Sequence, residues 1–173
     1  MPFSIIISFI GLLFLSAFFS SSETAYFNLR KHRGNFSNKV RDIINDPEKL
    51  LVTILTGNTI VNIAIGSLAA LIAHNIANDN QWSQTVLILF EVLVVSITIL
   101  IFGEIFPKII ALRNSERIAE KFSIPIKILF FLFTPIVFIS KVIVKIPTFF
   151  HMNKEKIFDS EEELKILTEL GEE

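Results

Sequence analysis

Hydrophobic side chains occur in long runs separated by short polar segments, and these runs predict membrane-spanning helices. Three runs lie at about residues 2–27, 50–76 and 85–107. Each provides the roughly 20 predominantly apolar residues that a helix needs to cross the ~30 Å hydrocarbon core of a bilayer. The first is uncharged over residues 2–22. The pattern therefore predicts an all-α membrane protein with three transmembrane helices.

A fourth apolar region, at about residues 118–150, has a different pattern. Lysines and prolines interrupt it, and its longest uncharged run, residues 128–140, is too short to cross a bilayer. Two interpretations remain open for it: juxtamembrane helices that lie in the interface or re-enter the membrane, and a kinked fourth span. We favour juxtamembrane helices, because segments of this length commonly lie in the interface.

The composition agrees with the membrane class and removes several kinds of chemistry. Of the 173 residues, 51% are hydrophobic, and the mean hydropathy is +0.60. The sequence has no cysteine, which excludes disulfides and thiolate metal sites. We find no Ser/His/Asp, Cys/His or metalloprotease pattern, so we expect no enzyme activity and no catalytic residue. No nucleic-acid partner is expected either.

Basic residues are distributed asymmetrically about the three predicted spans. The first connection, residues 28–49, is rich in Lys and Arg, whereas the second, residues 75–84, has neither. In a three-span arrangement all 16 Lys and Arg side chains fall on the same side of the membrane. The positive-inside rule then places the N-terminus outside and the C-terminus in the cytoplasm. We expect a multi-pass protein of the plasma (inner) membrane.

Local signals mark two helix starts and divide the chain. Asp46, Pro47 and Glu48 predict the start of the second spanning helix, with proline and acids in its first turn. Ser160 and Glu163 form a capping box that opens an acidic helix. We therefore expect two parts: a transmembrane domain at residues 1–150, and at residues 151–173 the start of an acidic cytoplasmic segment. We also expect the chain to lack further cytoplasmic domains.

Glu104 is the most unusual residue of the third span. A charged group at the centre of a membrane helix costs about 2.5–3.5 kcal/mol unless a cation or a polar cavity compensates it. Pro107 lacks the N–H group that would bond the carbonyl of Gly103 in a helix. A carboxylate and a freed carbonyl oxygen are thus adjacent, which indicates a hard cation. Lys108 has the spacing for a pair with Glu104, but we favour its extension to the inner membrane surface.

The end of the first span is unusually polar, with Ser20, Ser22 and Glu23 close to an apolar run. Helical spacing places Ser16, Ser20 and Glu23 on one face, whereas Ser22 points elsewhere unless the helix breaks. Membrane serines often bond carbonyls of their own helix or join helices together. The sequence favours neither that structural role nor a role as oxygen ligands.

The second span carries two amides at a helical spacing. Asn58 and Asn62 are four residues apart and therefore face the same direction, and Gly57 is consistent with close helix approach. The amides either hydrogen-bond another helix or offer oxygens to a cation, and we favour the cation. Glu91, a second acid of the third span, either reaches the outer interface or contributes to an outer ion site. Hydroxyl, amide, carboxylate and carbonyl oxygens are the ligands that Mg²⁺, Ca²⁺ and Na⁺ use.

Three polar motifs, in order, resemble the signatures of the transmembrane domain of the CorC/cyclin M (CNNM) magnesium transporter family. The resemblance covers essentially the whole chain, and Ser21 stands where relatives commonly have glycine. The motifs are Phe19-Ser20-Ser21-Ser22-Glu23-Thr24-Ala25, Gly57-Asn58-Thr59-Ile60-Val61-Asn62 and Phe102-Gly103-Glu104-Ile105-Phe106-Pro107-Lys108.

This resemblance implies a homodimer with three spans per subunit and a belt of juxtamembrane helices. It implies Na⁺-coupled export of Mg²⁺, with regulatory nucleotide-binding domains that lie outside this chain. The metal ligands that we expect from the motifs are Ser20, Ser22, Asn58, Asn62, Gly103 and Glu104. Candidates for supporting roles are Glu23, Gly57, Glu91, Pro107 and Lys108.

Two other functions fit the same residues. A passive divalent-cation channel would conduct without a Na⁺ gradient. A membrane anchor or Mg²⁺ sensor for cytoplasmic regulatory domains would not transport, so Glu104→Gln would leave ion flux unchanged in that case.

Overall fold

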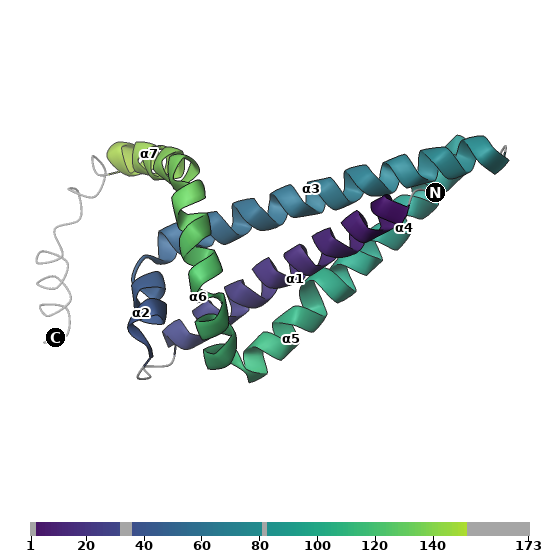
Figure 1. The fold of residues 1–173 in the computed structure, drawn as a ribbon. Coiled ribbons are helices and arrows are strands. Elements are labelled where there is room, and N and C mark those ends of the chain that lie inside the picture. Colours follow the sequence, from purple (N-terminus) through teal and green to yellow (C-terminus); the bar gives the residue numbers. More distant parts are fainter. Residues whose placement is uncertain (1–2, 32–35, 81–82, 152–173) are drawn as a thin grey trace, which may run out of the picture. The chain divides into compact units, whose positions relative to one another are not determined.

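The computed structural model describes residues 3–31, 36–80 and 83–151, which are almost entirely helical (Figure 1). They divide into two compact units, Met1–Thr134 and Pro135–Glu173. The first unit contains α1 to α6 and the second contains most of α7. No strand occurs among the described residues. The predicted all-α class is therefore confirmed.

Among the residues that the structure describes, three helices are long and apolar enough to cross a membrane, which confirms the number of spans predicted from the sequence. Their surfaces expose many Leu, Ile, Val and Phe side chains, as expected for helices in contact with lipid. In Figure 1, α1 lies between α3 and the third spanning helix, which is built from α4, η1 and α5. The elements are α1 (Phe3–Lys31), α3 (Pro47–Asn80), α4 (Gln84–Thr98), the π-helical η1 (Ile99–Ile105) and α5 (Phe106–Arg113).

The start of α3 follows from the residues around Pro47. Proline suits the first turn of a helix, where its missing N–H group has no intrahelical partner to lose. Asp46 Oδ1 accepts a hydrogen bond from the Lys49 backbone N–H at 3.1 Å, which satisfies another free donor of the first turn. The short α2 (Asn38–Ile44) precedes this start and buries Val40 and Ile43.

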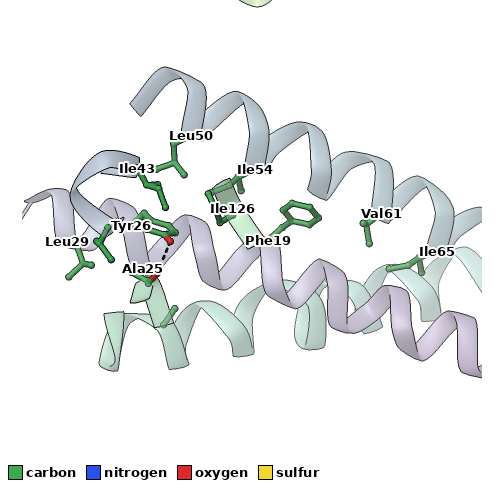
Figure 2. Packing of buried hydrophobic residues seen from close by; sticks show 13 residues of the cluster. Phe19, Ala25, Tyr26, Leu29, Ile43, Leu50, Ile54, Val61, Ile65 and Ile126 are labelled. Carbon is green, nitrogen blue, oxygen red and sulfur yellow. Dashed lines mark hydrogen bonds between the residues drawn. The ribbon is translucent and has the colours of Figure 1, made fainter. Parts of the chain in front are cut away.

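Helices α1 and α3 approach each other closely where Phe19 meets Gly57. A Cβ atom added to Gly57 would overlap the Phe19 ring, and only 3% of Phe19 is exposed. The ring points towards α3 within the cluster of buried hydrophobic residues in Figure 2. Small residues at such contacts allow the van der Waals packing that holds membrane helices together.

Helix α6 (Ser115–Leu132) is anchored on the second half of α1. The Tyr26 hydroxyl donates a hydrogen bond to the Ala119 carbonyl at 2.7 Å (Figure 2). The Phe18 and Phe122 rings meet edge to face at 4.7 Å. Ser115, Ala119 and Ser123 of α6 are small and buried, so the two helix axes can approach closely at these positions.

The predicted juxtamembrane region contains two helices, because α6 ends at Leu132 and α7 (Thr134–His151) follows after Phe133. Pro135 lies in the first turn of α7, where proline starts a helix more readily than it continues one. The pair qualifies as a fourth candidate span only when the two helices are counted as one broken span. Residues 152–173, with the predicted helix start at Ser160 and Glu163, lie outside the described residues.

Candidate cation site

The third spanning helix changes its winding at Gly103 and Glu104. Both residues belong to the π-helical η1, and the Phe106 N–H group that follows it bonds the Ile101 carbonyl, five residues back. In an α-helix the Pro107 ring would clash with the Gly103 carbonyl. A wider turn relieves this clash, and π-helical turns of this kind are frequent at functional sites.

Ser16 lies where the three spanning helices meet. Its Oγ atom is 2.9 Å from Asn62 Oδ1 and 3.2 Å from Asn58 Oδ1, both on α3. A Cβ atom added to Gly103 would lie 2.8 Å from the same Oγ atom, so the η1 backbone approaches Ser16 closely. Ser16 is completely buried. The structure thus brings Asn58, Asn62 and Gly103 together around Ser16.

This cluster has more oxygen lone pairs than protons. A serine hydroxyl carries one proton and can donate it to only one of the Asn58 and Asn62 oxygens at a time. The other amide oxygen then faces the Ser16 oxygen without a proton between them, unless that amide turns to present its NH₂ group. A cation relieves such crowding, and neutral hydroxyl and amide oxygens are accepted ligands of Mg²⁺, Ca²⁺ and Na⁺.

Ser20 lies one turn from Ser16 on the same face of α1. It is 2% exposed, and its Oγ atom finds no hydrogen-bond partner within the described part of the chain. A buried hydroxyl without a partner costs about 1–3 kcal/mol. The position of Ser20 therefore fits a role as a ligand, because its unsatisfied oxygen is available to coordinate a cation.

Ser22 is placed differently. Helix α1 is continuous from Phe3 to Lys31, so Ser22 points away from the face of Ser20. It lies on the side of Phe18 and Tyr26, which contact α6. Ser21 donates its hydroxyl proton to the Phe18 carbonyl at 3.1 Å and so is satisfied within α1. The structure does not bring Ser22 to the Ser16 cluster.

The charged residues of the motifs separate into a single acid and an ion pair. Glu104 follows Gly103 in η1, is partly exposed, and forms no hydrogen bond or ion pair with any residue that the structure describes. Lys108 Nζ lies 3.4 Å from Glu23 Oε2 and thus joins α5 to α1. Pairing of Glu104 with Lys108 assumes regular α-helical spacing, whereas Glu104 lies in the π-helical turn. Of the two acids, only Glu104 is without a basic partner in the described part of the chain.

Glu91 lies outside this cluster. It is twelve residues before Gly103 in the third spanning helix, which corresponds to about 18 Å along a regular helix. It lines an apolar groove of about 390 Å³ between α1, α3 and α4, together with Ile6, Phe9, Ala69, Ile72, Ala73, Leu87, Phe90, Val94 and Val95. The structure therefore separates Glu91 from the other predicted site residues.

Two buried hydroxyl residues, Ser16 and Thr53, were not among the site residues predicted from the sequence. Ser16 shares a helix face with Ser20 and Glu23, and that spacing was the available signal for it. Thr53 is completely buried one turn before Gly57, and its hydroxyl has no partner among the described residues. We find no sequence signal that would have selected Thr53, because a lone threonine in an apolar helix usually bonds its own backbone.

The donor set limits the kind of metal that the cluster can hold. Within residues 3–31, 36–80 and 83–151, no group of three or more His, Cys, Asp or Glu side chains could hold a metal ion. The candidate ligands near Ser16 are neutral oxygens. Glu104 directly follows Gly103 and has no basic partner among the described residues. Such a set favours a hard cation over zinc or copper, which prefer imidazole and thiolate ligands.

Comparison with known proteins agrees with the motifs. The family described as "Cyclin M transmembrane N-terminal domain" (CNNM) matches residues 7–173. A UPF0053 protein of Haemophilus influenzae is 31% identical over 174 residues, which cover 92% of this chain and 40% of that protein. The UPF0053 inner membrane protein YfjD of Escherichia coli is 29% identical over 139 residues, which cover 76% of this chain and 31% of that protein.

The chain thus spans less than half of either relative. The match to the family extends over nearly all of the chain and includes the three motifs that carry the resemblance. The resemblance to the CorC/cyclin M proteins is therefore confirmed. This multi-pass membrane protein belongs to the CNNM family.

Proposed function

We propose that this domain binds Mg²⁺ between its three spanning helices and exports it across the plasma (inner) membrane in exchange for Na⁺. The observation that carries the proposal is the convergence of Asn58, Asn62 and Gly103 on the Ser16 hydroxyl. Three helices that contribute to one buried oxygen cluster can bind an ion and also move relative to one another around it. The Na⁺ coupling and the direction of transport are drawn from the family resemblance.

The proposed ligands are oxygens from α1, α3 and η1. They are the Ser20 hydroxyl, the Asn58 and Asn62 amides, the Gly103 carbonyl and the Glu104 carboxylate, to which the structure adds the Ser16 hydroxyl. Ser22 can join this set only in a state in which α1 unwinds near Ser20.

This composition suits transport of Mg²⁺ better than permanent storage. Mg²⁺ gives up its water reluctantly and prefers six oxygens at about 2.0–2.1 Å in octahedral geometry. Neutral ligands with one carboxylate can replace part of the hydration shell without holding the ion so tightly that it is not released. Alternating access would then require the helices to shift around the ion, and the π-helical η1 is a suitable place for such a shift.

We also propose that the domain functions as a homodimer. The apolar side chains that remain exposed on the three spanning helices exceed what a single packing face of a soluble helix would show. A second copy and the lipid bilayer together would cover this surface.

Transport by the purified protein in proteoliposomes tests the proposal. Vesicles loaded with Mg²⁺ are assayed for efflux with and without an opposing Na⁺ gradient, and Glu104→Gln serves as the inactive variant. Saturable efflux that depends on Na⁺ and is lost in the variant supports Na⁺-coupled export. Efflux that persists without Na⁺ and does not saturate would instead identify a passive channel. Mg²⁺ binding without any flux would identify a membrane anchor or sensor.

A further inference from the structure

The ion pair between Glu23 and Lys108 lies next to the proposed Mg²⁺ site. Its Nζ–Oε2 distance is 3.4 Å, and it links α1 to α5. The two side chains are 39% and 41% exposed, respectively, so solvent can reach them. An exposed pair of this kind contributes little to stability. Its main effect is therefore on the charge near the proposed site.

Glu23 shares a face of α1 with the hydroxyls of the site. It follows Ser20 by three residues and Ser16 by seven, so all three lie on one side of a continuous helix. The rise per residue places Glu23 about 4.5 Å from Ser20 and about 10 Å from Ser16 along the axis. The Glu23 carboxylate is thus close enough to attract a cation that is held by the proposed ligands.

Lys108 determines whether the negative charge of Glu23 attracts a cation at the site. Glu23 and Lys108 together have no net charge, so among the described residues Glu104 is the one acid of the motifs that meets the cation without a basic partner. Without Lys108 the cation would meet two negative charges from two helices. Without Glu23 it would meet the unpaired Lys108 ammonium, which would repel it.

We infer that Lys108 is a positioning residue that sets the cation affinity of the site, because its ion pair with Glu23 cancels the negative charge of this second acid. This inference rests on the proposed Mg²⁺ site and adds a means by which it stays weak enough to release its ion. The pair does not bind the ion itself. It keeps the charge of the site at the level of one carboxylate.

Mg²⁺ titration of the purified protein by calorimetry tests this role through variants with opposite expected effects. Lys108→Met should tighten Mg²⁺ binding on the order of tenfold, because a divalent ion about 10 Å from a newly unpaired carboxylate gains Coulomb attraction. Glu23→Gln should weaken binding by a similar factor. The double variant should return to within about threefold of the wild-type affinity, and Lys108→Arg should match the wild type because arginine keeps the charge. Damage to the fold can explain weaker binding but not tighter binding.

The matched control is Lys127→Met. Lys127 forms the ion pair with Asp42, at 2.8 Å, that joins α6 to α2 away from the cluster, and its loss should leave the affinity unchanged. If Lys108→Met does not yield folded protein, Lys108→Gln makes the same change of charge. Unchanged or weaker binding in the folded Lys108 variant would overturn the inference, as would a double variant that keeps the tighter binding. A wild type that binds Ca²⁺ but not Mg²⁺ would overturn the proposed cargo alone, because the same series read with Ca²⁺ still decides the role of Lys108.

Discussion

The Ser16 hydroxyl of α1 lies 2.9 Å from the Asn62 amide oxygen of α3, and Ser16 is completely buried. Asn58 approaches the same hydroxyl at 3.2 Å. Interhelical hydrogen bonds in membranes contribute on the order of 0.6–2 kcal/mol, so this contact joins α1 to α3 in addition to supplying oxygens. The two roles can be separated by measuring binding and stability in the same variants.

Ser16→Ala should weaken Mg²⁺ binding by about tenfold or more, because it removes the oxygen on which both amides converge. Calorimetric titration with Mg²⁺ measures the change. The matched control is Ser21→Ala, since the Ser21 hydroxyl bonds the Phe18 carbonyl within α1 and should be replaceable without loss of affinity. Equal affinities for Ser16→Ala and the wild type would remove Ser16 from the site.

Glu104→Gln and Asn62→Ala should each abolish measurable Mg²⁺ binding while the protein stays folded. Glutamine has nearly the same shape as glutamate but no negative charge, so its effect reports on electrostatic attraction to the cation. Calorimetry and size-exclusion chromatography measure binding and assembly, respectively. Glu91→Gln is the control, because the same change about 18 Å away along the helix should leave the affinity of the inner site intact. An equal loss of affinity in Glu91→Gln would contradict a site localised at Glu104.

Gly57→Ala should lower the thermal unfolding midpoint, since the new methyl group would overlap the buried Phe19 ring and separate α1 from α3. Overpacking of this kind typically costs about 1–3 kcal/mol. Gly66→Ala on the same helix is the matched control, because nothing lies within 4 Å of a Cβ atom at Gly66. Alanine is also a better helix former than glycine, by up to about 1 kcal/mol. Phe19→Leu should partly restore the stability of Gly57→Ala; a double variant no more stable than Gly57→Ala would contradict this packing.

The spanning helices were predictable because the bilayer imposes a length and a composition that can be read along the chain. The start of α3 was predictable for a similarly local reason, since Pro47 and its neighbours act within a single turn. The break between α6 and α7 was not foreseen as such. Proline was recognised there, but whether Pro135 kinks one helix or starts another depends on what each segment packs against.

The candidate site was only partly predictable, because its contacts depend on how helices pack. Asn58 and Asn62 could be placed on one face from their spacing, but the register that brings Ser16 to them comes from the packing of α1 on α3. The pairing of Lys108 with Glu23 is a contact between helices in the same way. Ser22 could reach the cluster only if α1 broke near it, whereas α1 is continuous in the structure.

Gly103→Ala links the packing of η1 to the geometry of the site. The added Cβ atom would lie 2.8 Å from Ser16 Oγ and 3.3 Å from Ser16 Cβ, so η1 and α1 must move apart. We expect both a lower unfolding midpoint and a loss of Mg²⁺ affinity of about tenfold or more, because the ligands no longer converge. Gly11→Ala on α1 is the control, since a Cβ atom there meets nothing within 4 Å.

Combining Gly103→Ala with Ser16→Gly tests whether the clash between these two residues causes the loss of stability. The second change removes both Ser16 atoms that the new methyl group would approach. The double variant should therefore regain much of the thermal stability that Gly103→Ala loses, apart from about 1 kcal/mol for glycine within α1. Its Mg²⁺ affinity should stay low, because the Ser16 hydroxyl is absent. Recovery of affinity together with stability would show that Ser16 serves packing alone.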